Sequence, residues 1–177
     1  IRFYLEENTA APRETGLRDR RDRMGTQTLR FTEVRILGTD GNELTTVLSG
    51  QDIVVRFYYE SQQELNNADV NIAFNLYNTQ GAVITNLNSK DVGRLRLPIV
   101  KSGWFECVWP KFSLRAGIYT CALFCEVNGE IVDWLQSAFQ IRVEEGDFFG
   151  TGSIIQRGQG EILVTYDWRS SGEQPVA

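Results

Sequence analysis

The stretch GIYTCALFCEVNGEIVDWLQSAFQIRVEE, residues 117–145, carries the strongest secondary-structure signal in the chain. Apolar and polar side chains alternate along it with a period of two, which is the period of a half-buried β-strand. Asn128-Gly129 interrupts the alternation, and this pair suits the type I′ turn of a tight hairpin. The stretch therefore predicts strands over 117–127, 130–135 and 138–145.

From Thr28 onward the chain consists of short runs of Val, Ile, Phe and Tyr, separated by Gly, Asn and Asp at strand-plus-turn spacing. No segment shows sustained helical periodicity. The pattern is typical of an all-β, immunoglobulin-like antiparallel β-sandwich. Further strands are predicted at 28–38, 44–48, 51–60, 68–77, 82–87 and 103–109, with another near 161–167.

Composition narrows the classes of function. With 177 residues, 42% of them hydrophobic, the chain is long enough for one sizeable core. A net charge of -5 argues against a nucleic-acid binder with a broad basic surface and favours a neutral or polar partner. The absence of histidine removes the commonest general base and metal ligand, so we expect no metal and no cofactor. An enzyme would have to use carboxylates, Lys, Tyr or Cys.

Three cysteines, Cys107, Cys121 and Cys125, stand inside apolar runs. An odd number without framework spacing favours buried free thiols in a reducing compartment over a disulfide scaffold. No apolar run reaches the length of a membrane span, and no secretory pattern opens the chain.

Residues 1–27 begin with a short apolar run and continue with alternating Arg and Asp, interspersed with Pro12, Gly16 and Gly25. This composition predicts a tether, and the start at Ile1 fits a fragment of a longer protein. The arginines could hold a phosphate or an acidic partner, but the aspartates among them favour a solvated linker. The arginines are Arg18, Arg20, Arg21 and Arg23.

Alternation also assigns the faces of the strands. In 68–77 it points Val70, Ile72, Phe74 and Leu76 toward the core. If 68–77, 117–127 and 138–145 are neighbours, their outward residues form one surface. That surface combines Asn71, Asn75, Tyr77, Thr120, Phe124, Glu126, Gln140 and Arg142.

Amides, a carboxylate, a guanidinium and two aromatic rings on this surface suit a sugar, because hydroxyls pair with polar groups while the ring's C–H face lies on an aromatic side chain. Trp134, near the hairpin, is a further candidate platform, whereas Trp109 shares the core face with Phe105 and Cys107. The same residue types also occur on any solvated sheet face, where Phe124 and Tyr77 would cover the next strand or a dimer partner.

Two other chemistries remain weaker interpretations. A glycosidase needs two facing carboxylates, for which Glu126 and Asp133 are the nearest candidates, but nothing in the sequence supplies a deep cleft. The glycine-rich stretches at 146–152 and 157–160 do not lead into a helix or end in Gly-Lys-Ser/Thr, so they indicate tight loops and not a phosphate loop.

The segment FQIRVEEGDFFGTGSIIQRGQGEILVTYDW, residues 139–168, resembles the closing segment of a known family: the C-terminal carbohydrate-binding domain of the ATPase subunit of O-antigen polysaccharide ABC transporters, the Wzt type. EGDFFGTG followed by GQG and a strand ending in Tyr-Asp-Trp is the specific part. MGTQTLRFTEVRILGTDGNE at 24–43 is similar to the family's opening strand and first turn, and the resemblance covers roughly residues 24 to 168.

The resemblance implies a non-catalytic domain that recognises O-antigen polysaccharide on an exposed sheet face, for export in lipopolysaccharide biosynthesis. It implies a homodimer with an exchanged C-terminal strand, and as partners an ATP-binding domain and a membrane subunit, at the cytoplasmic side of the inner membrane. We carry over no individual binding residue. The alternatives are a structural dimerisation or gating module without glycan contact and a carboxylate-based glycan hydrolase.

The expected organisation is a linker at 1–27, the sandwich body at 28–145, a glycine hinge and swapped strand at 146–168 and a tail at 169–177.

Overall fold

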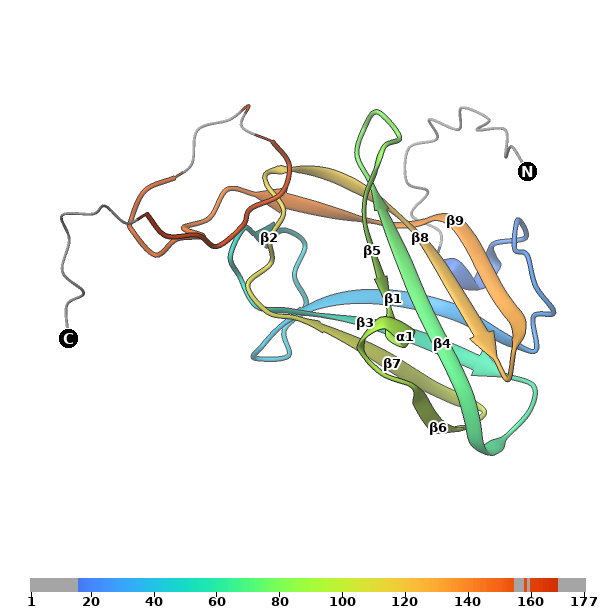
Figure 1. The fold of residues 1–177 in the computed structure, drawn as a ribbon. Coiled ribbons are helices and arrows are strands. Elements are labelled where there is room, and N and C mark those ends of the chain that lie inside the picture. The colour runs from blue at the N-terminus through green and yellow to red at the C-terminus, as the bar shows by residue number, and fades with distance from the viewer. Residues whose placement is uncertain (1–15, 155–157, 159, 169–177) are drawn as a thin grey trace, which may run out of the picture.

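The computed structural model describes residues 16–154, 158 and 160–168. This part of the chain folds into two facing sheets with very little helix (Figure 1), which confirms the predicted all-β sandwich. The elements in chain order are η1 (Leu17–Asp19), β1 (Leu29–Gly38), β2 (Val47–Leu48), β3 (Ile53–Ser61), β4 (Leu65–Tyr77), β5 (Val83–Asn88), α1 (Ser89–Val92), β6 (Leu95–Ile99), β7 (Ser102–Trp109), β8 (Gly117–Val127) and β9 (Glu130–Glu144).

The two sheets differ in width. The smaller has the strand order β1-β3-β7, and the larger has the order β2-β9-β8-β4-β5, with β6 pairing with the first half of β4. All pairings are antiparallel except the short one between β2 and β9. The strands β4, β8 and β9 are neighbours, as the predicted surface requires.

Phe57 of β3 lies at the centre of the core between the sheets. Its ring centroid is 5.4 Å from that of Phe74 and 6.1 Å from that of Phe139, both in the larger sheet, and 6.0 Å from that of Phe31 in its own sheet. The side chains predicted to point inward from β4 are buried, as are the inward residues of β8. Period-two alternation therefore places a continuous apolar layer between the sheets.

One strand, β9, replaces the two predicted at 130–135 and 138–145. The register against β8 shifts twice, between Cys125 and Glu126 and between Cys121 and Leu123, and Ser137 has a φ of 45°. These irregularities are β-bulges, which let one strand continue while its side chains change face. As a result Trp134 pairs with outward-facing Phe124, and Asp133 pairs with core-facing Cys125.

Residues 16–27 pack against the sandwich. Met24 exchanges two backbone hydrogen bonds of 2.9 Å with Trp134, which extends the outer edge of β9. Leu17 is buried, and the Arg23 guanidinium donates to Asp133 Oδ2 at 2.5 Å and to the carbonyls of Leu17 and Phe31. The expectation of a solvated segment is wrong for Leu17 and Arg23, because an internal carboxylate on β9 binds the guanidinium.

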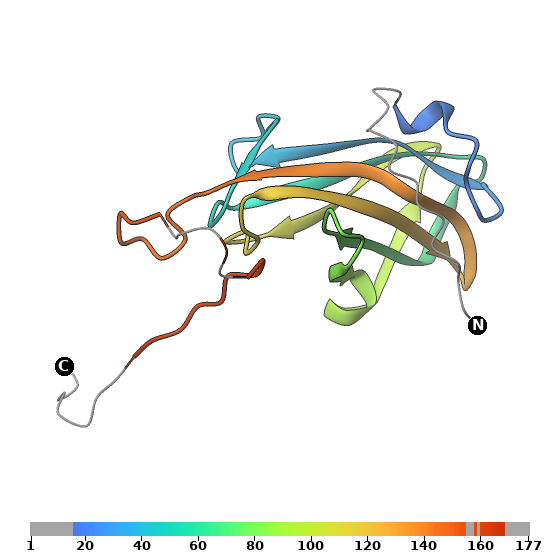
Figure 2. The ribbon, with the colours of Figure 1, turned by 90° about the horizontal axis from the view of Figure 1, so that it is seen from above.

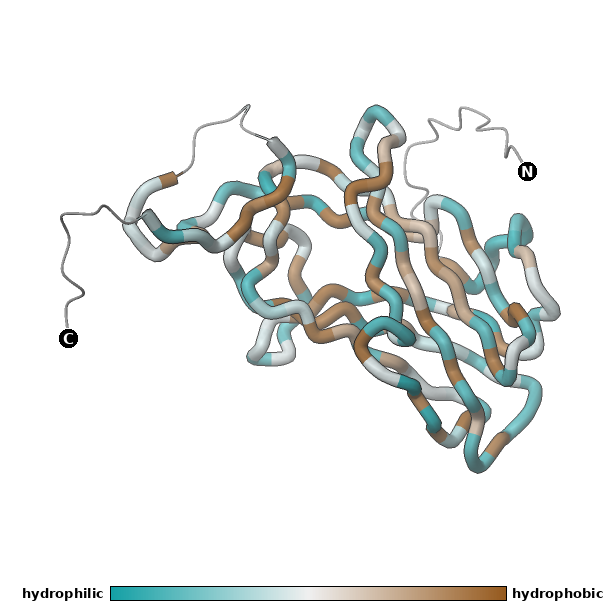
Figure 3. The backbone as a smooth tube through the Cα atoms, viewed as in Figure 1, coloured by the Kyte–Doolittle hydropathy of each residue, from teal (hydrophilic) through white to brown (hydrophobic). Residues whose placement is uncertain are grey.

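The expected strand near 161–167 is reduced to a single bridge, between Leu114 and Ile162. Leu163 still covers the core and donates its amide to the Ser113 carbonyl at 2.6 Å, but the residues after it run away from the body (Figure 2). A strand requires a neighbouring edge to pair with, and within the described chain no edge is opposite residues 164–168. Apolar residues recur along this exposed segment (Figure 3).

The ion pair between Arg23 and Asp133 gives a test of the packing of residues 16–27. Both side chains are fully buried, and the Asp133 carboxylate also accepts the Phe31 amide at 2.7 Å. Burial raises the pKa of Asp133, because the loss of water outweighs the attraction of these two partners. Asp133→Ala leaves a buried guanidinium without its carboxylate, so we expect the free energy of unfolding to fall by about 3–5 kcal/mol in urea titrations.

The exposed pair Arg18–Glu60, with an N–O distance of 2.6 Å, is the matched control. Glu60→Ala should change stability by less than about 1 kcal/mol, because water screens this pair. Equal losses for Asp133→Ala and Glu60→Ala would show that Arg23 is not held inside the protein in solution.

Candidate functional site

The outer side of β4, β8 and β9 carries the predicted surface, and the strand register determines which of its residues meet. Tyr77 lies opposite Thr120, which in turn lies opposite Gln140, so these three form one row across the strands. Phe124 and Trp134 form a second row. The sheet thus gathers residues that are up to 71 positions apart in the sequence, from Asn71 to Arg142, into one surface, which we call the large-sheet face. The face consists of Asn71, Asn75, Tyr77, Thr120, Phe124, Glu126, Trp134, Gln140 and Arg142.

Hydrogen bonds hold the amides of this face in position. Asn75 Nδ2 donates to the Tyr77 hydroxyl at 3.3 Å, and the Asn86 amide of β5 donates to Asn75 Oδ1. Gln140 Nε2 donates to the Thr120 hydroxyl at 3.3 Å. Each amide retains donors or acceptors beyond these bonds, so the face can pair with hydroxyl groups of a ligand with little loss of side-chain entropy.

The aromatic pair of the face lies beside these amides. The rings of Phe124 and Trp134 meet edge to face, with centroids 6.0 Å apart and planes at 83°. Both side chains are half-buried, so each is supported by the sheet and still reaches solvent. A rigid, partly exposed aromatic ring next to fixed amides is the arrangement on which the C–H face of a sugar ring can lie.

Two residues of the face are less available than the alternation predicts. Asn71 is buried, because the turn at α1 covers it and its Oδ1 accepts the Ser89 hydroxyl at 3.2 Å. Glu126 is half-buried and pairs with Lys90 at 2.7 Å. Alternation within the strands did not indicate Asn86 and Lys90 as neighbours of the face, since only the pairing of β5 with β4 brings this segment alongside it.

Arg142 lies at one end of the face, next to a hollow of about 640 Å³ between the sandwich and the glycine-rich segment. The hollow is also bordered by Glu145, whose Oε1 is 3.9 Å from Arg115 Nε. Arg142 is exposed and thus more accessible to a ligand than Asn71.

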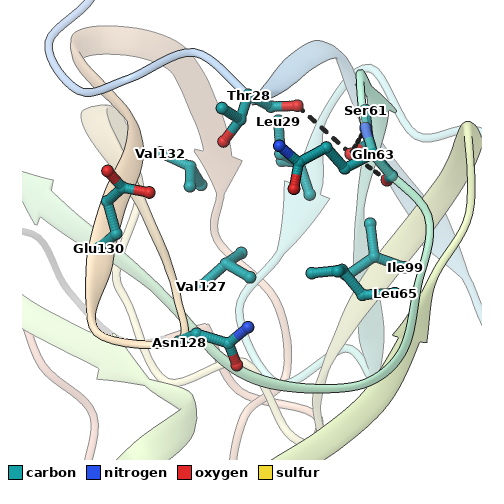
Figure 4. A pocket seen from close by; sticks show the side chains of 10 residues that line it. All are labelled: Thr28, Leu29, Ser61, Gln63, Leu65, Ile99, Val127, Asn128, Glu130 and Val132. Atoms are coloured by element: carbon teal, nitrogen blue, oxygen red, sulfur yellow. Dashed lines mark hydrogen bonds between the residues drawn. The ribbon is translucent and has the colours of Figure 1, made fainter.

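A second, smaller hollow of about 160 Å³ opens at the end of the sandwich where β8 turns into β9 (Figure 4). Leu65, Ile99 and Val127 point into it, and Thr28 and Gln63 stand at its rim. Its volume is below the roughly 300–1,000 Å³ typical of sites that enclose a small ligand. This second hollow is therefore too small to enclose a small ligand, whereas the hollow beside Arg142, at about 640 Å³, is within that range.

The carboxylate pair considered for a glycosidase does not form. Glu126 points out of the large-sheet face toward Lys90, whereas Asp133 points into the core toward Arg23. The bulge that separates them in register puts the two carboxylates on opposite sides of the sheet, so they cannot flank one glycosidic bond.

Of the other predicted aromatics, Trp109 packs against Phe112 at 4.5 Å and borders the core, as expected. Within the described ranges, no group of acidic or cysteine side chains could hold a metal ion. No helix in the described part of the chain is long and apolar enough to cross a membrane.

Fold and site together define an immunoglobulin-like β-sandwich module with an extended polar and aromatic sheet face. A family model, described as the Wzt C-terminal domain, matches residues 20–156, and the chain belongs to this family, the C-terminal domain of ABC-transporter ATPase subunits of the Wzt type. A crystal structure of the C-terminal domain of Wzt has a similar fold, with a TM-score of 0.65 and 14% sequence identity; the match covers 88% of this chain and 91% of that one. No curated protein sequence matches the chain significantly.

The burial of the three free cysteines predicts how fast each thiol reacts. Cys121 and Cys125 are fully buried, and burial raises the pKa of both thiols well above the usual range of a cysteine. Cys107 is half-buried, and burial raises the pKa of its thiol as well. The thiolate is the reactive form, so near neutral pH the folded protein should leave Cys121 and Cys125 unlabelled by a maleimide and label Cys107 slowly. Peptide mass spectrometry reports the sites.

Unfolding in guanidinium should make all three thiols react, and an added exposed thiol in Thr45→Cys is the control for reagent activity. Rapid labelling of Cys121 in the folded protein would contradict the burial described here.

Proposed function

We propose that this domain binds O-antigen polysaccharide on the large-sheet face and couples that recognition to export by an ABC transporter. The observation that carries the proposal is the row of Tyr77, Thr120 and Gln140 beside the Phe124–Trp134 pair, all on stiff neighbouring strands. Family membership supports the transporter context. Binding is non-catalytic, and the domain acts at the cytoplasmic side of the inner membrane through the transporter.

The shape of the face sets the expected affinity. A shallow surface covers only part of a sugar chain, and each hydroxyl that bonds to an amide gives up a bond to water, so one repeat unit gains little net free energy. A polymer contacts several positions at once, and we therefore expect affinity to rise with chain length.

Isothermal titration with O-polysaccharide, released by mild acid from the organism that encodes the chain, tests the proposal. Trp134→Ala and Gln140→Ala should each weaken binding about tenfold, because each removes a contact worth on the order of 1 kcal/mol. Gln136→Ala is the matched control, since Gln136 is an exposed glutamine on the same strand outside the face. Two results together would contradict glycan binding: the unaltered protein binds no glycan, and the variants do not affect export. The domain would then act as a structural dimerisation or gating module.

The exposed C-terminal segment supports the proposed homodimer. Trp168 is 84% exposed and Tyr166 63%, and such a run of apolar side chains is usually covered by a partner. We propose that the segment after Leu163 pairs with a second copy, where it forms the strand that the single chain lacks. The exposed apolar side chains of the segment are Val164, Tyr166 and Trp168.

Sedimentation velocity tests the dimer. The unaltered protein should sediment as a dimer, and Tyr166→Ser combined with Trp168→Ser should shift it toward monomer at the same concentration, because the partner loses two aromatic anchors. Val92→Ser, at a 90% exposed position in α1, should leave the dimer unchanged. A monomer for the unaltered protein at all concentrations would rule out the exchange.

A further inference from the structure

The solvent face of the smaller sheet carries a second aromatic and ionic cluster, on the side of the sandwich opposite the large-sheet face. Trp104 of β7 is 52% exposed and lies opposite Tyr58 of β3, while Glu106 of β7 lies opposite Arg56 of β3. Alternation explains this outward orientation, because the residues between them on both strands are in the core. We call Arg35, Arg56, Tyr58, Trp104 and Glu106 the small-sheet cluster.

The members of this cluster hold one another in place. Arg56 Nε and Nη2 both contact Glu106 Oε1, at 2.7 and 2.6 Å, and the Arg56 guanidinium lies 4.8 Å from the centroid of the Trp104 ring. Arg56 Nη1 also donates to the Tyr58 hydroxyl at 3.4 Å, and the Arg35 guanidinium lies 5.2 Å from the Tyr58 ring. Cations and rings thus alternate across all three strands, which restricts their rotamers before any ligand arrives.

Aromatic side chains on the core side of β3 and β7 support the small-sheet cluster. Tyr59 and Phe105 stack with ring centroids 4.6 Å apart, one on each strand. Gly103, next to Trp104, leaves room for the Tyr59 ring: a Cβ there would come within 2.6 Å of the Tyr59 hydroxyl. Glycine at this position therefore lets the Tyr59 ring lie over β7 beside the exposed tryptophan.

The charge balance of the cluster indicates the chemistry of its ligand. Arg56 is paired with Glu106, and Arg35 with Glu33 at 2.7 Å, so the face has little net charge to attract a charged polymer. A protein partner would have to bury these ion pairs, and charged residues are depleted in the cores of protein interfaces for that reason. A polyol does not impose this cost, because each hydroxyl can donate to a carboxylate and accept from a guanidinium.

From this geometry we infer that the small-sheet cluster is a second glycan-binding site, in which a sugar ring lies on Trp104 and its hydroxyls bind Arg56 and Glu106. The inference rests on the proposed function, since the ligand is the same class of polymer. A repeating polysaccharide offers identical units to both faces, so two weak sites on one domain raise the affinity for a long chain without deepening either site.

Indole N–H signals in NMR spectra report each site separately, because Trp104 is in the small-sheet cluster and Trp134 on the large-sheet face. Tryptophan-to-phenylalanine variants assign the four signals. The probes are O-polysaccharide released by mild acid from the encoding organism and single repeat units prepared from it. We expect both indole signals to shift on addition of either probe, and Trp104→Ala to weaken polysaccharide binding about tenfold while the Trp134 shift persists.

Val108→Ala is the matched control, because Val108 is an exposed apolar residue on the same strand outside the cluster. Arg56→Gln combined with Glu106→Gln tests the polar half of the site and should also weaken binding. A Trp134 shift without a Trp104 shift at saturation would overturn the second site and leave the proposed function intact. No binding of the polysaccharide would overturn both, and a Trp104 shift alone would move the function to the smaller sheet.

Discussion

The contacts of Phe57 across the sandwich are the constraint on which the rest of the structure depends. Its ring meets Phe74 and Phe139 of the larger sheet, so it joins three strands through one side chain. Because Phe57 faces inward, its neighbour Tyr58 must face outward, and the same holds for Phe74 and Asn75. Core packing between the sheets thus orients the outward side chains of both sheets.

The two register shifts between β8 and β9 determine which way the side chains of Asp133 and Trp134 point. Two bulges allow a single strand to run along β8, to expose Trp134 and to turn the adjacent Asp133 inward. The carboxylate then requires a cation, which Arg23 provides from the segment that precedes β1. That segment also pairs its backbone with Trp134. The chain entering the domain is therefore joined to the strand that carries the aromatic residue of the large-sheet face.

The two sheet faces for which we propose glycan binding are built in similar ways. Each combines an aromatic ring with polar groups that are already hydrogen-bonded to one another, and each is carried by strands instead of loops. Prior ordering reduces the entropy lost on binding, which matters when each hydroxyl contact is worth little. The homodimer that we propose would present four such faces to the proposed polysaccharide.

Sequence alternation was sufficient to predict the sandwich, the inward residues of β4 and most of the outward residues of β4, β8 and β9, because period-two burial is a local property of the chain. The closing motif was sufficient to indicate the family. Only the tertiary structure placed Arg23 inside, covered Asn71 with α1, turned Asp133 away from Glu126 and assembled Arg56, Trp104 and Glu106. Each of these depends on strand register, bulges or a partner distant in sequence, and register is set by packing between sheets, which no local pattern records.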